Sequence, residues 1–249
     1  MYHTLLCKLC IVLSVVTYSV KATTPVKFLV WADDLAPILY LDPQSKDYKG
    51  IVVDILSAGD IPIKFINHNR NRGEEALYAG ELDLAILSKE WVRYPEKLVY
   101  STPIYVHKEF LYGNHPISDK PLEELLVDKI ICTRRGYVYP KLDGFFKDKI
   151  SLRMDSHIEA TQFEMLRRDR CDFVMTNEFV GQWIIAKNDW GKDIYRSKTP
   201  IDEVDFTFAI HPKNQGFLDL LNHHIDQLKQ SGELQKIIKQ QRQFISKQE

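Results

Sequence analysis

The chain is poor in cysteine, lacks a long apolar run and carries almost no net charge. Its 33 lysine and arginine residues nearly balance its 34 acidic residues, so no basic face for nucleic acid is expected. The uncharged run at residues 9–20 falls well short of the ~20 residues that cross a bilayer, which argues against a membrane anchor. With 45% apolar residues, the chain is long enough for one large domain or for two smaller ones.

The amino terminus has the pattern of a signal peptide. Lys8 precedes the uncharged run, and Val20-Lys21-Ala22 offers small or aliphatic residues at the positions that a signal peptidase reads. We therefore predict a cleaved leader at residues 1–22 and an exported chain. Loss of Lys8 and Lys21 changes the formal charge from −1 to −3.

Two cysteines, Cys132 and Cys171, follow the predicted leader. An oxidising compartment permits them to pair, and each lies at the edge of a predicted strand. The alternative of two buried thiols is favoured, because sequence does not supply the Cα separation that a bridge requires. The exported chain has no Cys-x-x-Cys or His-x-x-x-His spacing, so we expect no metal and no cofactor.

One local pattern occurs twice in the chain. Residues 79–87 place a helix stop, Gly80, and then Asp83 before a short apolar strand, and a charged aromatic loop follows at residues 91–97. Residues 168–177 repeat the order of helix, turn, Asp and apolar strand. This repetition indicates two lobes built in the same way.

The first third of the chain reads as alternating strands and helices. Residues 26–31 and 61–66 predict strands, and residues 73–80 predict a helix. The first strand runs into Asp33 and Asp34, and ligands collect where strands of an open α/β sheet end. Arg70 lies in the predicted loop 67–72. An arginine in a cleft favours an anionic ligand, but a solvated loop arginine is the preferred interpretation.

These patterns resemble those of extracellular solute-binding proteins of family 3, the class that includes the polar amino-acid receptors of bacterial importers. The resemblance rests on the strand pattern at residues 79–87, the aromatic-Ser-x-Pro-x-Tyr run at 100–105, and the Gly-x-hydrophobic-x-x-Ile ending at 232–237. It implies an α/β, two-lobed periplasmic-binding-protein-like fold (type II) with two crossing strands as the hinge. Lobe 1 would comprise residues 25–110 and 205–249, and lobe 2 residues 111–204.

The resemblance also implies a ligand-binding cleft. In amino-acid receptors of this family an arginine after the first repeated strand holds the α-carboxylate, and Arg93 is the preferred match, with Lys97 as the alternative. Asn177 stands where an Asp usually pairs with the ligand ammonium, and Tyr137 replaces the usual Thr or Ser. The predicted ligand-binding residues are Asp33, Asp34, Arg70, Ser88, Trp91, Arg93, Arg135, Gly136, Tyr137 and Asn177.

The function that the resemblance implies is capture of a small, carboxylate-bearing solute in the periplasm by hinge closure, as a monomer. The partner would be an ABC permease, or alternatively a membrane signalling protein that senses the ligand. A few proteins of this fold dehydrate cyclohexadienyl acids, and Asp33, Asp34 or Glu178 could supply the acid for such chemistry. No catalytic motif is visible, so we do not expect an enzyme.

Overall fold

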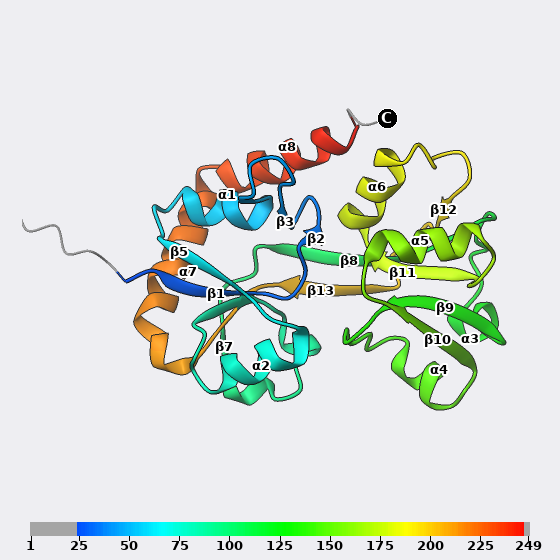
Figure 1. The fold of residues 1–249 in the computed structure, drawn as a ribbon, viewed down its shortest axis with the longest axis horizontal. Coiled ribbons are helices and arrows are strands. Elements are labelled where there is room, and N and C mark those ends of the chain that lie inside the picture. The colour runs from blue at the N-terminus through cyan, green and yellow to red at the C-terminus, as the bar shows by residue number, and fades with distance from the viewer. Residues whose placement is uncertain (1–23, 247–249) are drawn as a thin grey trace, which may run out of the picture.

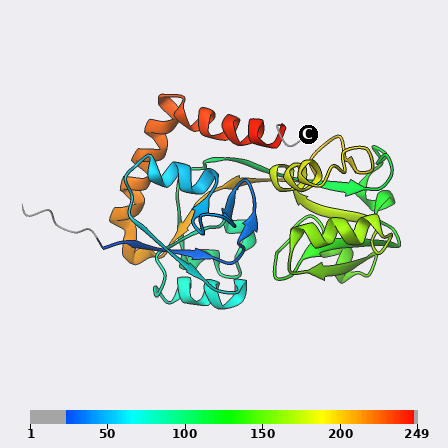
Figure 2. The same cartoon turned by 45° about the horizontal axis from the view of Figure 1, so that its top comes forward.

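The computed structural model describes residues 24–246, and the predicted leader at residues 1–22 lies outside them. Two α/β lobes lie side by side, each with a sheet at its centre and helices on both faces (Figures 1 and 2). This is the two-lobed arrangement that the sequence predicts. Among the described residues, no helix combines the length and apolar character needed to cross a membrane.

The first lobe is built on a five-stranded sheet of order β5-β1-β6-β14-β7. Strands β5, β1 and β6 are parallel, and β14 and β7 continue the sheet in antiparallel pairs. The buried centre of β1 consists of Phe28, Leu29 and Val30, the continuous apolar run that a strand covered on both faces requires. The bounds are β1 Val26–Val30, β5 Ile63–Asn67, β6 Leu84–Ile86, β7 Val99–Tyr100 and β14 Phe208–Ile210.

A small antiparallel sheet of β2 Asp34–Leu35, β3 Leu39–Leu41 and β4 Tyr48–Lys49 follows β1. Helices α1 Ile51–Ser57, α7 Gln215–Gln230 and α8 Glu233–Ser246 lie on one side of the first sheet, and α2 Arg70–Tyr78 lies on the other (Figure 1). Helix α7 buries Leu218, Leu221, Ile225 and Leu228, which is the spacing of an amphipathic helix. Helix α8 contacts α1 in its own lobe and α6 in the second lobe.

The second lobe has a six-stranded sheet of order β10-β9-β11-β8-β12, with β13 also paired to β8. Its strands are β8 Tyr105–Gly113, β9 Lys129–Arg134, β10 Ser151–Ser156, β11 Phe173–Asn177, β12 Tyr195–Arg196 and β13 Asp202–Phe206. Helices α5 Glu159–Arg167 and α6 Glu178–Lys187 lie on one side, and α3 Leu122–Leu125 and α4 Asp143–Lys147 on the other (Figure 1). Strands β9, β10 and β11 are parallel, as β5, β1 and β6 are in the first lobe.

Two antiparallel strands connect the lobes. Strand β8 leads out of the first lobe and β13 returns, paired from Tyr105 opposite Phe206 to Glu109 opposite Asp202. Figure 1 shows both running between the lobes. In proteins that close by hinge motion, a few loop or element-terminal residues absorb the change in φ/ψ, so the ends of β8 and β13 are where a hinge is expected.

Cys132 and Cys171 form a disulfide, with Cα atoms 5.8 Å apart. The preference for two free thiols is therefore wrong. Cys132 lies on β9, and Cys171 precedes β11, the strand that pairs with β9. Strand pairing thus brings the two Cα atoms within bridging distance, which their separation of 39 residues in sequence does not reveal.

Replacing both cysteines by alanine should lower the free energy of unfolding by roughly 3 kcal/mol, because the bridge closes a long loop in the unfolded chain. Urea denaturation monitored by circular dichroism measures this loss. A reducing agent should lower the midpoint of the natural chain and leave that of the double variant unchanged. Equal midpoints for the natural chain with and without reductant would show that the bridge does not stabilise the fold.

Candidate functional site

A cavity lies between the lobes, where the carboxyl ends of the parallel strands of both sheets meet. The first lobe contributes the segments after β1, β5 and β6, and the second lobe those after β9, β10 and β11. This is the edge at which open α/β sheets bind ligands. The centre of a water molecule can occupy about 80 Å³ of this cavity, which is enough room for several waters or a small organic molecule.

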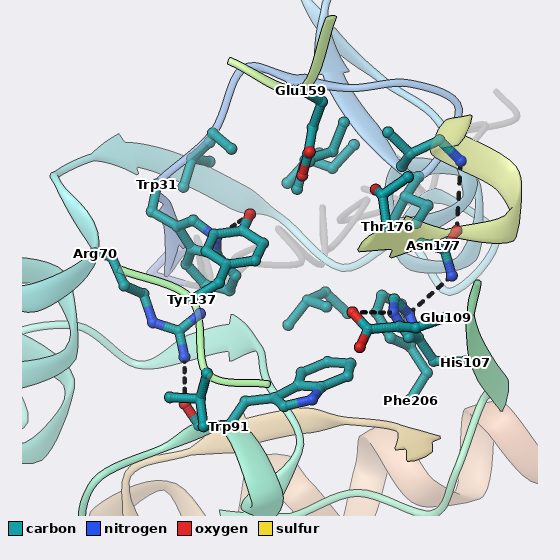
Figure 3. Close-up of a pocket in the computed structure, with 18 of the residues that line it drawn as sticks. Trp31, Arg70, Trp91, His107, Glu109, Tyr137, Glu159, Thr176, Asn177 and Phe206 are labelled. Atoms are coloured by element: carbon teal, nitrogen blue, oxygen red, sulfur yellow. Dashed lines mark hydrogen bonds and ion pairs between the residues drawn. The ribbon is translucent and has the colours of Figure 1, made fainter. Parts of the chain in front are cut away.

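Aromatic rings form much of the cavity wall (Figure 3). Trp31 follows β1, and its indole Nε1 donates a hydrogen bond of 2.9 Å to the hydroxyl of Tyr137 in the other lobe. Burial raises the pKa of Tyr137 to about 12, so its hydroxyl stays protonated. Trp91 lies across the cavity and meets His107 edge-on, with ring centroids 4.7 Å apart. Such rings favour a ligand with an apolar body or a cation.

Arg70 provides a buried positive charge to this wall. Asn69 caps α2 by accepting from the backbone of Arg72 (3.0 Å), so the helix begins at Arg70 and directs it toward the cavity. The guanidinium lies 4.6 Å above the Trp31 ring and donates from Nη2 to the carbonyl oxygen of Trp91 (2.7 Å). Its Nε has no hydrogen-bond partner among the described residues, and Glu74 is 3.8 Å away. The prediction of a solvated loop arginine is wrong, because the residue is 9% exposed and begins a helix.

A buried ion cluster joins the lobes beside the cavity. Arg134, at the end of β9, pairs through Nη2 with Asp34 of the first lobe (2.8 Å), and its Nη1 lies 3.8 Å from Glu159. Glu159 is the first residue of α5 and lines the cavity. Burial raises the pKa of Glu159 to about 7, against the opposing effect of Arg134 and with a smaller contribution from the charge of Asp34. This carboxyl group therefore changes its charge near neutral pH.

On the opposite side, three polar residues of the hinge and second lobe form a chain. Asn177 caps α6 and contacts the Nδ1 atom of His107 at 3.1 Å. His107 Nε2 lies 3.6 Å from Glu109, which is 7% exposed. Figure 3 shows Glu109 and Arg70 on opposite sides of the cavity, with Trp91 and Tyr137 between them.

The structure brings four of the predicted site residues to the cavity: Arg70, Trp91, Tyr137 and Asn177. Asp34 lies beside it in the pair with Arg134. Gly136 is also near, since a Cβ at its positive φ of 79° would lie 3.6 Å from the Arg70 Cβ.

Other predicted residues lie elsewhere. Asp33 accepts from Tyr48 and Asn67 within the first lobe (3.0 and 2.8 Å), and Ser88 is bonded to the backbone of Asp205. Arg93 is half exposed and pairs with Glu75 at 3.2 Å, away from the residues that line the cavity.

The loop after β9 also differs from its expected role. Arg135 is exposed and contacts His157 (3.2 Å). Its backbone N–H donates to Ser156 (2.8 Å), and that of Tyr137 donates to Arg134 (3.2 Å). These two amides are used within the protein, so the loop presents the Tyr137 side chain to the cavity.

Several lining residues were not predicted from the sequence: Trp31, His107, Glu109, Glu159, Thr176 and Phe206. Two carried a visible signal. Trp31 ends the first predicted strand, where ligand-binding loops begin. Glu109 stands directly before an apolar run in the crossing strand, where a buried carboxylate is rare and marks a candidate site for a partner of opposite charge.

Sequence comparison alone finds no relative: no protein-family model and no curated protein matches the chain. Solved structures do match it. A mutant of ArgBP from T. maritima aligns with a TM-score of 0.71, covering 87% of this chain and 93% of that one at 17% identity. The chain has the fold of a periplasmic binding protein. The predicted fold is thus confirmed, and at this identity the likeness concerns the fold alone.

Two further solved structures share this fold. A histidine kinase sensor domain with similarity to periplasmic binding proteins has a TM-score of 0.73 at 17% identity, covering 87% of this chain and 95% of that one. An ancestral amino-acid-binding protein, described as a precursor of cyclohexadienyl dehydratase, has a TM-score of 0.68 at 17% identity, covering 87% and 94%. Binding proteins and a kinase sensor domain thus share this architecture, and a fold alone does not decide the function, so residues of the cavity must do so.

Proposed function

We propose that this protein is a solute receptor that captures a small carboxylate-bearing molecule between its lobes. The observation that carries the proposal is Arg70, a buried guanidinium in an aromatic cavity between the carboxyl ends of two sheets. A guanidinium has five N–H donors in a planar fork that matches a carboxylate. In a cavity closed to bulk water, such a pair is stronger than it is at the surface.

Hinge closure would bring the ligand into contact with both lobes. We propose that residues 25–110 and 205–249 move as one body and residues 111–204 as the other, about β8 and β13. The Asp34–Arg134 pair and the Trp31–Tyr137 hydrogen bond join the two bodies at the cavity. A ligand that touches both bodies binds only the closed form well, so binding shifts the population toward closure.

We propose export through the leader at residues 1–22, function in the periplasm as a monomer, and delivery of the ligand to an ABC permease. A membrane-bound sensor is the alternative partner. No catalytic role is proposed, because the three acids considered for one make structural contacts. Asp33 is bonded to Tyr48, Asp34 pairs with Arg134, and Glu178 pairs with Arg196 at 3.0 Å.

A thermal-shift screen against amino acids, dicarboxylates, small peptides and aromatic acids tests the proposed function. A ligand at ~100 times its dissociation constant adds ~2.7 kcal/mol to the native state, which raises the melting temperature by several degrees. We expect a shift with carboxylates and none with their amides or esters. A protein that responds to no carboxylate, and from which native mass spectrometry releases no bound carboxylate, would not have the proposed function.

The variant Arg70→Met should weaken binding of the carboxylate found in that screen by about 2 kcal/mol, roughly 30-fold, because a charged hydrogen bond is lost while the apolar stem stays. Isothermal titration calorimetry measures the change. Arg93→Met is the matched control, since Arg93 is half exposed and pairs with Glu75. A loss of affinity with Arg93→Met and none with Arg70→Met would restore Arg93 as the carboxylate-binding residue and refute this assignment to Arg70.

A further inference from the structure

The side-chain amide of Asn177 has only one orientation that satisfies its neighbours. Its Oδ1 accepts from the backbone N–H groups of Phe179 (2.8 Å) and Val180 (3.4 Å), which begin α6. The Nδ2 atom of Asn177 must then face His107 and the carbonyl oxygen of Lys108, which lies 3.3 Å from it. Both ends of Asn177 are thus used within the protein, which leaves it poorly placed to bind a ligand ammonium.

This orientation also fixes the charge of His107. An NH₂ group only donates, so His107 Nδ1, 3.1 Å away, must accept and therefore carries no proton. The imidazole is then the neutral tautomer with its proton on Nε2. Its ring is held in place by stacking on Phe206, with centroids 5.6 Å apart and planes 13° from parallel. His107 consequently provides Glu109 with a neutral neighbour in place of a positive charge.

Glu109 is left as a buried carboxylate without a compensating charge. The Nε2 of His107 lies 3.6 Å from Oε1, beyond the usual hydrogen-bond range, and Oε2 has no hydrogen-bond partner among the described residues. Among the described residues, no lysine or arginine nitrogen comes within ion-pair distance of the Glu109 carboxylate. The neighbouring Lys108 pairs instead with Glu203 (3.1 Å). Two other acidic groups, Asp202 and Glu159, interact with the charge of Glu109, which raises the pKa of each. A buried charge in this state destabilises a protein unless something pairs with it.

The surroundings of Glu109 suit an organic cation. Glu109 lines the same cavity as Trp91, Tyr137 and Phe206, whose ring faces attract positive charge. Arg70 lies across the cavity from it (Figure 3). The cavity therefore has a positive site at one side and a negative site at the other, with aromatic walls between them.

We infer that Glu109 is the residue that binds the ligand's amino group, so the ligand is a zwitterion whose ammonium pairs with this hinge-strand carboxylate. The inference rests on the proposed function, because Arg70 supplies the site for the opposite end of the ligand. It transfers the role expected of Asn177 to its neighbour, since Glu109 lies directly opposite Asn177 in the β8–β11 pair. A residue of the hinge then contacts the ligand, which couples amine recognition directly to closure.

Calorimetric titration of the natural chain with matched pairs of probes tests the ligand class. Each pair shares a carboxylate and a carbon skeleton and differs in one amine, as L-alanine and propionate do, or L-phenylalanine and 3-phenylpropionate, or 4-aminobutyrate and butyrate. We expect the amine-bearing member of the best-binding pair to bind at least about 30-fold more tightly. Carboxylates that bind equally well without the amine would overturn the inference and leave the proposed function intact. If no member of any pair binds, and the thermal-shift screen and native mass spectrometry also find no carboxylate ligand, both fall.

The variant Glu109→Gln tests the residue. Binding of the amine-bearing probe should weaken roughly 30-fold or more, while binding of its amine-free partner stays within about threefold. In the absence of probe, the melting temperature should rise by ~2 °C or more, because a neutral amide is less unfavourable to bury than an unpaired carboxylate. Glu203→Gln is the control, since Glu203 lies on the paired strand β13 but is exposed and bound to Lys108.

The combination of higher stability and lost amine discrimination separates ligand binding from a structural role. A lower melting temperature together with equal loss for both members of a pair would mean that Glu109 only supports the hinge, and the inference would be wrong. Unchanged discrimination in Glu109→Gln would also refute it. A comparable loss in Glu203→Gln would attribute the effect to the hinge strands and not to the pairing of Glu109 with an amine.

Discussion

Replacing Arg134 by methionine should lower the free energy of unfolding by about 3 kcal/mol at pH 8 and open the lobes. Arg134 is 6% exposed and is the cation between Asp34 (2.8 Å) and Glu159 (3.8 Å). Without it, Glu159 stays buried beside Asp34 with no ion-pair partner, and the first lobe loses its ion pair to the second. Removing one member of a buried cluster is more damaging than replacing the whole cluster by apolar groups.

The size of this effect should depend on pH. At pH 5 Glu159 is largely protonated, because burial raises its pKa to about 7, so loss of its cationic neighbour matters less. Urea denaturation at both pH values gives the stabilities, and small-angle X-ray scattering of the ligand-free protein gives the radius of gyration, which should increase in the variant.

Arg135→Met is the matched control for this experiment. Arg135 is the next residue, but it is exposed and bonded to His157, so the change should stay within about 0.5 kcal/mol and leave the scattering curve unaltered. If Arg134→Met behaved like Arg135→Met in both measurements, the buried cluster would have no part in closure.

Replacing Glu159 by glutamine should remove a pH dependence of stability worth about 3 kcal/mol. The pKa of Glu159 rises from 4.5 to about 7 on folding, chiefly because burial penalises the charged form. At ~1.4 kcal/mol per unit, that shift corresponds to roughly 3 kcal/mol. Besides Arg134, the groups that act on Glu159 are Asp34, Glu109 and the side chain of Gln162.

The sign follows from proton binding. Between pH 4.5 and 7 the folded protein keeps the Glu159 proton that the unfolded chain has released, so stability falls as pH rises through this window. Below it both states are protonated, and above it both are ionised. The glutamine variant should match the natural chain near pH 4 and exceed it in stability at pH 8.

Denaturant midpoints measured from pH 4 to 8 give this difference, with Glu164→Gln, an exposed position of the same helix α5, as the control. A difference between the Glu159→Gln variant and the natural chain that stays constant across the range would show that Glu159 does not titrate in this window.

The overall fold could be predicted from sequence because its signals are local. The apolar run of β1, the helical spacing of α7 and the repeated pattern before β6 and β11 each specify their element without reference to the rest of the chain. The pattern occurs twice, which indicates two similar lobes, and the two-lobed fold itself was predicted from the resemblance to a known family. Cys132 and Cys171 show what local signals do not reveal, because the distance between these two residues depends on which strands pair.

The site was harder to predict because burial and charge pairing decide it. Arg134 and Arg135 are adjacent residues of the same type, yet Arg134 is buried in an ion cluster and Arg135 is exposed. Arg93 and Lys97 lie on either side of the expected position, and Arg93, the preferred match, contacts Glu75, 18 residues earlier. The role of Asn177 depended on a helix cap and on the tautomer of His107, and only coordinates reveal either.

The contacts that join the lobes are made by the protein's own groups. Asp34 binds Arg134, and Trp31 binds Tyr137, through atoms that belong to the two lobes and not to a ligand. In the proposed receptor, such contacts bias the equilibrium toward the closed form before any solute binds, and their strength sets how often the empty protein adopts the shape of the loaded one. A permease or sensor that recognises only shape would respond to that background. In the proposed receptor, the strength of the cross-lobe pairs therefore sets both the response in the absence of ligand and the affinity for ligand.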